Sequence, residues 1–376
     1  MHALKTILLT GSKGFIGSNM TARLNQEDGW QVIPFDIENS DADLEHFVYK
    51  ADFIFHFAGV NRSDSVEAFE AGNSDLTWKI VSILKKNNLR TPVVMTSSIH
   101  SELDTPYGIS KRKAETHLKH YIKSGGIAYI YRLSNVFGKW CRPNYNSVVA
   151  TFCHNIANGK KISISNRKTQ IEFIYIDDVI DEFIRLLRQK QQDKIKGYYT
   201  ISPSYTVSLG ELADTLYRFK DIRESLCVPD FSNAFVKKLH ATYLSYLPWH
   251  RLSYRLKKYE DHRGDLFELI KSEQFGQIFV STTKSGVTRG DHYHHTKNEK
   301  FCVIQGDAEI KLRHILNNEI MTYSVSGKMP EVIDIPPGYT HSITNVGVKD
   351  VITLFWANEM FSAEKPDTYF EKVIDE

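Results

Sequence analysis

Short apolar runs alternate with amphipathic stretches over the first half of the chain, and this alternation restricts the possible folds more than any other feature. Five runs are long enough for strands but too short for helices: TILLTG, WQVIPFD, ADFIFHFAG, TPVVMTSS and IAYIYRLSN. Helical patterns lie between them, for example over residues 74–88 and 110–124. Such alternation predicts a parallel sheet covered by helices. We therefore expect an α/β domain with a doubly wound, Rossmann-type parallel sheet.

The pattern changes near residue 246. The stretch YLSYLPWHRLSYRLKKY is aromatic and basic, contains Pro248 and has no clean period. After residue 259, short strand runs are separated by turn sequences such as DHRGD, KSGVTRGD and DIPPGYT, a pattern that predicts a small β-barrel or sandwich. We expect an NAD(P)-binding domain over 1–245, a linker over 246–256 and an all-β domain over 257–376.

Composition excludes several other classes of protein. The 376 residues are 41% hydrophobic and 24% charged, as in ordinary globular proteins, and a net charge of +2 lacks the basic excess of a dedicated nucleic-acid binder. No apolar stretch reaches the roughly 20 residues that cross a membrane, and the first apolar run is too short for a signal peptide. The four cysteines form no CxxC pair, so we expect reduced thiols and a cytoplasmic protein without membrane insertion.

A glycine-rich turn, TGSKGFIG, follows the first predicted strand and precedes a helical run. Such a turn can approach a pyrophosphate at a helix N-terminus. Asp36, at the end of the second predicted strand, can bind ribose hydroxyls and favours NAD, whereas Lys13 lies where the ribose phosphate of NADP could sit. The predicted cofactor contacts are Gly11, Lys13, Gly14, Phe15, Ile16, Gly17, Asp36, Ala58 and Lys111.

The sequence YGISK places Tyr107 and Lys111 one turn apart on the same face of a helix. The lysine charge is expected to lower the pKa of the Tyr107 phenol, which can then exchange a proton near neutral pH. The preceding TSS, at the end of a predicted strand, offers a hydroxyl for a substrate carbonyl oxygen. A lone YxxxK is common by chance, but the ordered set of glycine turn, Asp36, HFAG, TSS and YxxxK is not.

This ordered set resembles the extended short-chain dehydrogenase/reductase family, and so do the sequences YRLSNVFG and FIYIDDV. The resemblance covers about residues 3–245. It implies Tyr107 as proton donor and Lys111 as the residue that binds the nicotinamide ribose. It also implies a serine on the substrate carbonyl, for which the spacing favours Ser97 over Ser98.

Further features of this resemblance concern the substrate. Asn135 and Arg142 are implied contacts of a UDP or dTDP group. Sugar dehydratases of the family carry an Asp-Glu pair after the strand-end hydroxyl residue, which supplies the acid and base for loss of water. The corresponding stretch here, TSSIHS, has no carboxylate, and this argues against dehydration.

Near the other end of the chain, His292, His294, Glu299 and His341 have the spacing of a metal site. Three imidazoles and a carboxylate suit a divalent ion such as Zn, Fe, Mn or Ni, and we favour zinc. An H-x-H sequence in a strand directs both rings to one face. Turn residues surround all four candidates, so surface histidines without a shared role are the weaker interpretation.

This metal pattern resembles the cupin superfamily, with a departure at Pro330, where a glycine is usual. The sequences YEDHRGDLFEL and GVTRGDHYH also resemble dTDP-4-keto-6-deoxy-sugar 3,5-epimerases, which use a histidine at the place of His292 as base without metal. The two resemblances conflict, because a metal-bound His292 could not readily act as a base. We favour the metal site and leave the base unassigned. Lys300 is a candidate to stabilise an enolate oxygen, and Arg263 and Arg289 are candidates to bind diphosphate.

One substrate can account for both halves of the chain. A proton beside a ketone is removable because the resulting charge spreads onto oxygen, whereas reduction destroys the ketone, so epimerisation must come first. The whole arrangement resembles the bifunctional UDP-4-keto-6-deoxy-HexNAc epimerase/reductases of bacterial capsule and O-antigen synthesis. The resemblance implies C3 epimerisation of UDP-2-acetamido-2,6-dideoxy-4-hexulose and then NADPH-dependent C4 reduction. It also implies UDP-N-acetyl-6-deoxy-L-talosamine, the precursor of N-acetyl-L-fucosamine, as product, and a homodimer.

Two other hypotheses stay open. A UDP-sugar epimerase that retains bound NAD, with the cupin as a ligand-sensing module, predicts purified protein with stoichiometric nicotinamide. A non-enzymatic sensor or scaffold predicts that Tyr107→Phe keeps full function.

Overall fold

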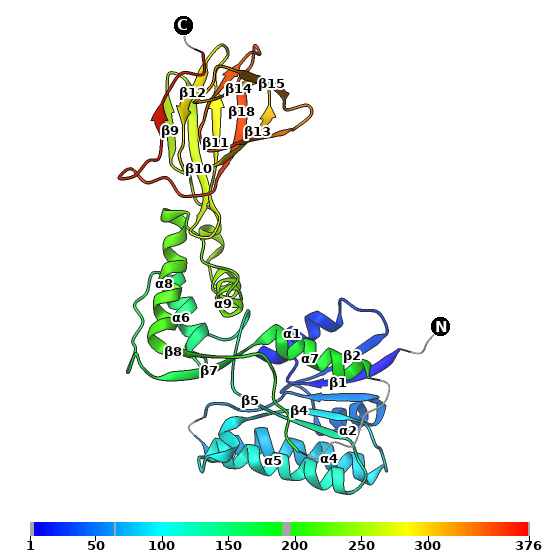
Figure 1. The fold of residues 1–376 in the computed structure, drawn as a ribbon. Coiled ribbons are helices and arrows are strands. Elements are labelled where there is room, and N and C mark those ends of the chain that lie inside the picture. Colours follow the sequence, from blue (N-terminus) through cyan, green and yellow to red (C-terminus); the bar gives the residue numbers. More distant parts are fainter. Residues whose placement is uncertain (1–3, 64, 190–196, 375–376) are drawn as a thin grey trace. The chain divides into compact units, whose positions relative to one another are not determined.

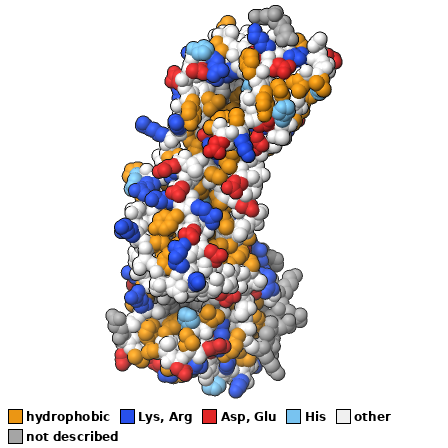
Figure 2. Space-filling view, turned by 60° about the vertical axis from the view of Figure 1, so that its left-hand side comes forward, with side chains coloured by type: hydrophobic (Ala, Val, Ile, Leu, Met, Phe, Trp, Pro, Cys, Tyr) orange, Lys and Arg blue, Asp and Glu red, His pale blue; other side chains and the backbone are white. Residues whose placement is uncertain are grey.

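The computed structural model describes residues 4–63, 65–189 and 197–374 (Figure 1). The chain forms two compact units, one of residues 1–216 and 238–248 and the other of residues 217–237 and 249–376. Figure 2 shows positive and negative side chains interspersed over the face in view, as the near-neutral net charge leads one to expect. Within the described residues, no helix combines the length and the apolar character that crossing a bilayer requires.

A five-stranded parallel sheet forms the centre of the first unit, as the strand–helix alternation predicts (Figure 1). Its strand order is β2-β1-β3-β4-β5, and each neighbouring pair runs parallel. The strands are β1 (Lys5–Thr10), β2 (Trp30–Phe35), β3 (Phe53–His56), β4 (Val93–Ser98) and β5 (Ala128–Leu133).

Helices cover both faces of this sheet, so the predicted doubly wound fold is confirmed. Ile7 and Leu9 of β1 pack with α1 and α7, whereas Leu8 between them packs with α2, α4 and α5. Because successive side chains of a strand point to opposite faces, each strand must be apolar on both, and this explains the continuous apolar runs in the sequence. The helices are α1 (Phe15–Leu24), α2 (Asp41–Lys50), α4 (Leu76–Lys86), α5 (Pro106–Lys123) and α7 (Ile176–Arg188).

A smaller sheet with the order β6-β7-β8 completes the first unit's strands. Its strands are β6 (Asn135–Phe137), β7 (Gln170–Tyr175) and β8 (Ser204–Ser208).

The other helices of the described residues are α3 (Val66–Phe69), η1 (Glu70–Asp75), η2 (Ile99–Glu102), α6 (Val148–Ala157), α8 (Leu209–Ser225), α9 (Ala234–Ser245) and η3 (Trp249–Arg251).

Local interactions define the start of α5, the helix that carries the YxxxK sequence. The Thr105 side chain accepts a hydrogen bond from Gly108 N at 3.1 Å, and Pro106 occupies the first helical position, where no N–H is needed. Gly108 packs so closely against the preceding loop that a Cβ there would lie 2.3 Å from Leu103 O and 2.4 Å from His100 O. This cap and this close contact set the position of the helix at the carboxyl end of β4.

Two antiparallel sheets form the part of the second unit after residue 257, so the all-β class predicted for that part is confirmed. One sheet has the order β16-β13-β18-β11-β10-β9 and the other β15-β14-β17-β12-β19. Phe301, Ile343 and Phe355 belong to one buried apolar cluster to which both sheets contribute. The strands are β9 (Lys258–Asp261), β10 (Gly264–Ser272), β11 (Gly276–Thr283), β12 (Thr288–Tyr293), β13 (Glu299–Gln305), β14 (Asp307–His314), β15 (Ile320–Ser326), β16 (Val332–Ile335), β17 (Tyr339–Asn345), β18 (Val351–Ala357) and β19 (Tyr369–Phe370).

The division into units differs from the predicted boundaries at residues 217–237, which belong to the second unit. Backbone hydrogen bonds explain this assignment. Val228 N donates to Lys271 O, and Lys271 N donates to Leu226 O, both at 2.8 Å. The segment is thereby attached to β10, a contact that joins residues too distant in sequence for local pattern to indicate.

The close packing of Gly108 leads to a stability prediction. Gly108→Ala should lower the free energy of unfolding of the first unit by about 1–3 kcal/mol, because the added methyl group overlaps two carbonyl oxygens. Chemical unfolding, followed on the transition that added nicotinamide cofactor shifts, measures the change. Thr116→Ala, at an exposed position of the same helix, is the control and should change stability by less than about 0.5 kcal/mol. Equal stability of the two variants would contradict the packing argument.

Candidate functional site

Tyr107 and Lys111 lie in the first unit, where α5 begins beside the carboxyl end of β4. Both side chains are largely buried, and the Lys111 ammonium lies 6.0 Å from the centre of the Tyr107 ring. The ammonium donates a hydrogen bond to Thr96 O at 3.2 Å. The predicted pairing of the two side chains on one helix face is therefore present in the structure.

Burial changes the acidity of both groups. It raises the pKa of the Tyr107 phenol, and a hydrogen bond with the Ser98 side chain offsets part of that rise. Burial also lowers the pKa of Lys111 to about 8, while the nearby Glu115 carboxylate acts in the opposite direction. The net shift of the Tyr107 pKa is upward, because desolvation of the phenol outweighs the hydrogen bond with Ser98, and a lowering by the Lys111 charge stays a prediction. The phenol is consequently protonated at neutral pH, which is the form that donates a proton.

Ser98, and not Ser97, lies beside Tyr107. The Ser97 hydroxyl donates a hydrogen bond to Glu115 Oε1 at 2.6 Å and is turned toward the buried side of α5. Ser98 is the hydroxyl that bonds Tyr107. Neighbouring residues at the end of a strand point to opposite sides, so the two serines cannot share one role. This geometry corrects the preference for Ser97.

A cleft of about 430 Å³ connects the glycine turn with Tyr107 and Lys111. Among the residues that line it are the predicted ones Gly11, Lys13, Gly14, Phe15, Ile16, Gly17, Lys111, Asn135 and Arg142. Ser98, Trp140 and Cys141 line it as well. Trp140 has a left-handed φ of 68°, which is uncommon for a large side chain and marks a strained loop next to the cleft. The sequence did not indicate this loop.

Asp36 and Ala58 both contact the glycine turn. The Asp36 carboxylate accepts hydrogen bonds from the Ser12 hydroxyl and from Lys13 N, the latter at 3.1 Å. Gly11 approaches Ala58 so closely that a Cβ on Gly11 would lie 2.6 Å from Ala58 N. The Lys13 ammonium at the surface forms an ion pair with Glu38 at 2.6 Å. A cation therefore lies near the carboxyl end of β2 together with the Asp36 carboxylate.

Glu115 is a buried acid that the sequence analysis missed. Its side chain is 1% exposed and accepts hydrogen bonds from Arg132 at 2.9 Å and 2.8 Å as well as from Ser97. Burial alone would raise the pKa of Glu115, but hydrogen bonds from Arg132, Ser97 and Tyr198 lower it by more. The pKa therefore lies below its usual value, and the carboxylate is charged. Its position four residues after Lys111, on the buried face of the helix, was the available signal.

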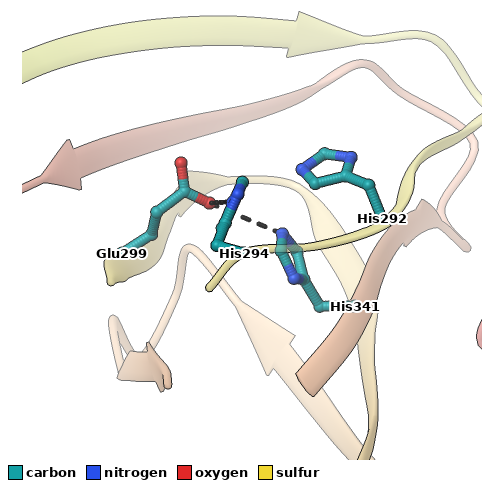
Figure 3. A group of neighbouring side chains, drawn as sticks. All are labelled: His292, His294, Glu299 and His341. Carbon is teal, nitrogen blue, oxygen red and sulfur yellow. Dashed lines mark ion pairs between the residues drawn. The ribbon is translucent and has the colours of Figure 1, made fainter. Parts of the chain in front are cut away.

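The four predicted metal ligands come together in the second unit (Figure 3). His292 lies in β12, His294 just after it, Glu299 begins β13 and His341 lies in β17. The ligand atoms that they offer all lie within 4.8 Å of one another. A bulge between Gly290 and His292 shifts the register of β12 against β17 and sets His292 directly opposite His341.

Hydrogen bonds orient two of the imidazoles toward the carboxylate. The ring nitrogen Nδ1 of His294 lies 2.6 Å from Asp367 O, and Nδ1 of His341 lies 3.2 Å from Tyr339 O. Each Nε2 atom then lies 3.4 Å from Glu299 Oε2. Neither Nε2 has a hydrogen-bond partner within the described part of the chain, although both are buried. Buried nitrogens with free lone pairs beside a carboxylate are what a divalent cation requires.

The protonation of this group also suits a cation. Burial lowers the pKa of His292 to about 4, and the neighbouring His341 and His294 lower it further, so the ring is neutral at pH 7. For Glu299, burial raises the pKa, but the His294 and His341 rings beside the carboxylate outweigh it and hold the pKa well below its usual range. A neutral imidazole and a charged carboxylate are the forms that bind metal.

Lys300 lies outside this group. It follows Glu299 in β13 and therefore points to the opposite face of the sheet, where its ammonium pairs with the exposed Asp334 at 2.5 Å. The role predicted for Lys300 at an enolate oxygen is not compatible with this position. Arg289 differs, because it pairs in register with the buried Ile343 and its Nε is buried without a hydrogen-bond partner among the described residues. Arg263 forms an ion pair with Asp261 at 2.6 Å.

Comparisons with known proteins match a family to each of the two units. Residues 7–202 match the NAD dependent epimerase/dehydratase family, and residues 259–369 match the polysaccharide biosynthesis C-terminal domain. A curated relative from Pseudomonas aeruginosa, described as UDP-2-acetamido-2,6-beta-L-arabino-hexul-4-ose reductase, is 44% identical over 364 residues, which are 96% of this chain and 97% of the relative.

Solved structures are similar to the whole chain or to its first part. The crystal structure of the capsular polysaccharide assembling protein CapF from Staphylococcus aureus has a TM-score of 0.90 and 42% identity, covering 98% of this chain and 100% of CapF. UDP-glucuronic acid 4-epimerase from Bacillus cereus, crystallised with UDP-glucuronic acid and NAD, has a TM-score of 0.52 and 19% identity over 57% of this chain and 82% of its own. The second similarity supports the fold alone.

The position of Glu115 leads to a prediction about pH. The Lys111 ammonium is charged below its pKa of about 8, and nicotinamide-dependent turnover should fall as the pH rises through that value. Glu115→Gln removes the charge that stabilises the ammonium, so the pKa of Lys111 drops and the alkaline limb of the pH–rate profile moves to lower pH. Glu102→Gln, at the exposed partner of Arg132, is the control and should leave the profile in place. An unchanged alkaline limb in Glu115→Gln would contradict this role.

Proposed function

The chain belongs to the NAD dependent epimerase/dehydratase family, and we propose that it epimerises and then reduces a UDP-activated 4-keto-6-deoxy amino sugar. The observation that carries this proposal is the presence of two built sites on one chain, a Ser98–Tyr107–Lys111 set in the first unit and a three-histidine, one-glutamate set in the second. The relative described as a UDP-2-acetamido-2,6-beta-L-arabino-hexul-4-ose reductase matches nearly the whole chain and supports the substrate class.

The first unit would carry out the reduction of the C4 ketone. Tyr107, protonated at neutral pH, donates its proton to the ketone oxygen, and Ser98 beside it binds the same oxygen. Lys111 binds the ribose next to the nicotinamide and supplies positive charge while the phenol loses its proton. A bound nicotinamide cofactor supplies the hydride. Asn135 and Arg142, which line the same cleft, would hold the UDP group.

NADPH is the proposed cofactor. Lys13 lies beside Asp36 near the end of β2 and can exchange its ion pair with Glu38 for a ribose phosphate. Asp36 would favour ribose hydroxyls, but its carboxylate already accepts hydrogen bonds from Ser12 and Lys13 N in the glycine turn. The family resemblance agrees with NADPH.

The second unit would carry out the C3 epimerisation before reduction. His292, His294, Glu299 and His341 would hold a divalent metal, which we take to be zinc, and the cupin resemblance agrees with this assignment. Such an ion would stabilise negative charge on an oxygen beside the carbon that loses its proton. Arg289, whose guanidinium has an unused buried N–H, is the proposed contact of the diphosphate, with Arg263 near it. The residue that removes the proton stays unassigned.

Chemistry fixes the order of the two steps. The C3 proton can be removed only while C4 is a ketone, and reduction makes the new configuration permanent. The product of the proposed sequence is UDP-N-acetyl-6-deoxy-L-talosamine, a precursor of N-acetyl-L-fucosamine for capsule or O-antigen. The homodimer implied by the family resemblance stays a prediction.

The two activities should separate in a variant of the first unit. Tyr107→Phe should reduce the rate of NADPH oxidation by about 10²–10⁴-fold, because the ketone oxygen loses its proton donor. Incubation with a UDP-4-keto-6-deoxy-HexNAc in deuterated water, followed by NMR, should show unchanged deuterium incorporation at C3. Tyr49→Phe, at an exposed site on α2, is the control and should match the unaltered protein in both assays. Loss of both activities in Tyr107→Phe would count against separate sites.

The converse result is expected for the second unit. His341→Ala, or removal of the metal with a chelator, should abolish C3 deuterium incorporation and leave the reductase active on an already epimerised ketone. His250→Ala, an exposed histidine in the same unit, should change neither activity. Deuterium exchange that survives complete removal of the metal would show that the ion takes no part in epimerisation.

A further inference from the structure

Residues 367–373 form a strap along the three-histidine, one-glutamate set, although no motif in the sequence connects them with it. Within this strap, Phe370 pairs with His292 and Tyr369 pairs with Tyr293, as β19 adds to the edge of β12. The strap therefore joins the sheet at the position of a proposed metal ligand. Its two ends are held by separate sets of hydrogen bonds.

At one end, the Asp367 carboxylate binds the loop that follows His294. It accepts hydrogen bonds from three successive backbone N–H groups: His295 at 3.0 Å, Thr296 at 2.9 Å and Lys297 at 2.9 Å. The Thr296 hydroxyl donates a further hydrogen bond at 2.9 Å. Asp367 has a left-handed φ of 40°, a conformation that aspartate tolerates better than most residues. One side chain thus binds three successive residues of this loop.

The backbone of the same residue orients a ligand. Asp367 O accepts a hydrogen bond from Nδ1 of His294 at 2.6 Å, and the His294 side chain is 2% exposed. This contact leaves Nε2 as the free nitrogen and directs it toward Glu299 (Figure 3). The carboxylate and the carbonyl of Asp367 act together, because the carboxylate fixes the place from which the carbonyl reaches the ring.

At the other end, the buried Arg313 holds the strap. Its guanidinium donates hydrogen bonds to Val373 O at 3.1 Å and to Lys372 O at 2.8 Å, and it pairs with the Glu371 carboxylate at 3.0 Å. A guanidinium with several fixed acceptors is a rigid anchor. The strap is therefore attached to β14 independently of Asp367.

Two more contacts at this end adjoin the ligands. Thr340, which precedes His341, donates its hydroxyl hydrogen to Glu371 O. The backbone carbonyl of Asp291, the residue before His292, accepts a hydrogen bond from Glu371 N at 2.9 Å. The strap thus contacts all three histidine-bearing segments within one or two residues of the histidine.

We propose that Asp367 is a positioning residue of the metal centre, which it assembles by holding the His294 ring and the loop after it in the orientation that binds the cation. This inference deepens the proposed function and depends on the metal site assigned there. Outer contacts of metal-bound histidines typically contribute 10–100-fold to metal affinity, because they fix the ring orientation and leave the correct nitrogen free. The strap supplies such a contact to the one ligand that lies beyond the end of its strand.

The test compares three variants of the full chain after removal of metal. Asp367→Gly keeps the left-handed backbone and loses the carboxylate, so its affinity for Zn²⁺ should fall by about 10–100-fold. Asp367→Asn keeps one acceptor oxygen and should lie between Asp367→Gly and the unaltered chain. Asp334→Asn, which removes an exposed carboxylate on the outer face of the same unit, should bind Zn²⁺ as the unaltered chain does. Competition with a zinc-binding dye gives the affinities, and the visible spectrum of bound Co²⁺ reports the ligand geometry.

Several results would decide against the proposal. If Asp367→Gly binds Zn²⁺ as tightly as the unaltered chain and gives the same Co²⁺ spectrum, Asp367 has no positioning role. This conclusion holds even if the substitution lowers the stability of the metal-free protein. If Asp367→Gly does not fold, Asp367→Asn decides in the same way, by weaker binding or by unchanged binding. If His341→Ala binds Zn²⁺ as tightly as the unaltered chain does, the metal site itself is wrong, and the inference about Asp367 is lost with it. Weaker binding in the order Gly, Asn, unaltered, with Asp334→Asn unaffected, supports the proposal.

Discussion

Lys111 is 6% exposed at the carboxyl end of β4, and the first unit can keep its ammonium there because Glu115 lies one helical turn further along α5. A buried charge is costly unless other charges or hydrogen bonds compensate for it. Thr96 O accepts one hydrogen bond from the ammonium, and the Glu115 carboxylate acts on it through space. The same carboxylate binds Ser97 and Arg132, so a single buried acid connects α5 with β4 and β5.

In the second unit, by contrast, two buried polar atoms lack a hydrogen-bond partner among the described residues. His294 and His341 each have one nitrogen paired with a backbone carbonyl and the other directed at Glu299 without a hydrogen bond. Protein interiors usually satisfy such atoms, so their state here indicates a role in binding and not in folding. The first unit compensates its buried charge with its own groups, whereas the second unit leaves two buried nitrogens beside a carboxylate without a hydrogen-bond partner among the described residues.

Periodicity explains which site residues could be predicted from the sequence. The tyrosine and lysine of YxxxK are separated by one helical turn, and Glu299 begins a strand whose inward face is marked by the buried Phe301 and Val303, so local spacing was sufficient. The roles predicted for Ser97 and Lys300 conflict with the same alternation of side chains along a strand. Ser97 and Ser98, and likewise Glu299 and Lys300, are neighbours in strands, and only one member of each pair can face the site.

The sequence by itself determined the α/β and all-β classes, the glycine turn, the tyrosine–lysine pair and the three-histidine, one-glutamate set, because each follows from spacing within one element or from turn residues beside it. Only the tertiary structure decided the contacts of Glu115 with Arg132, the attachment of residues 217–237 to β10, and the strap that carries Asp367 to His294. These contacts join residues far apart in the chain, for example 73 positions for Asp367 and His294. No local pattern records such a pairing, because it depends on which strand edge or buried face the fold leaves open.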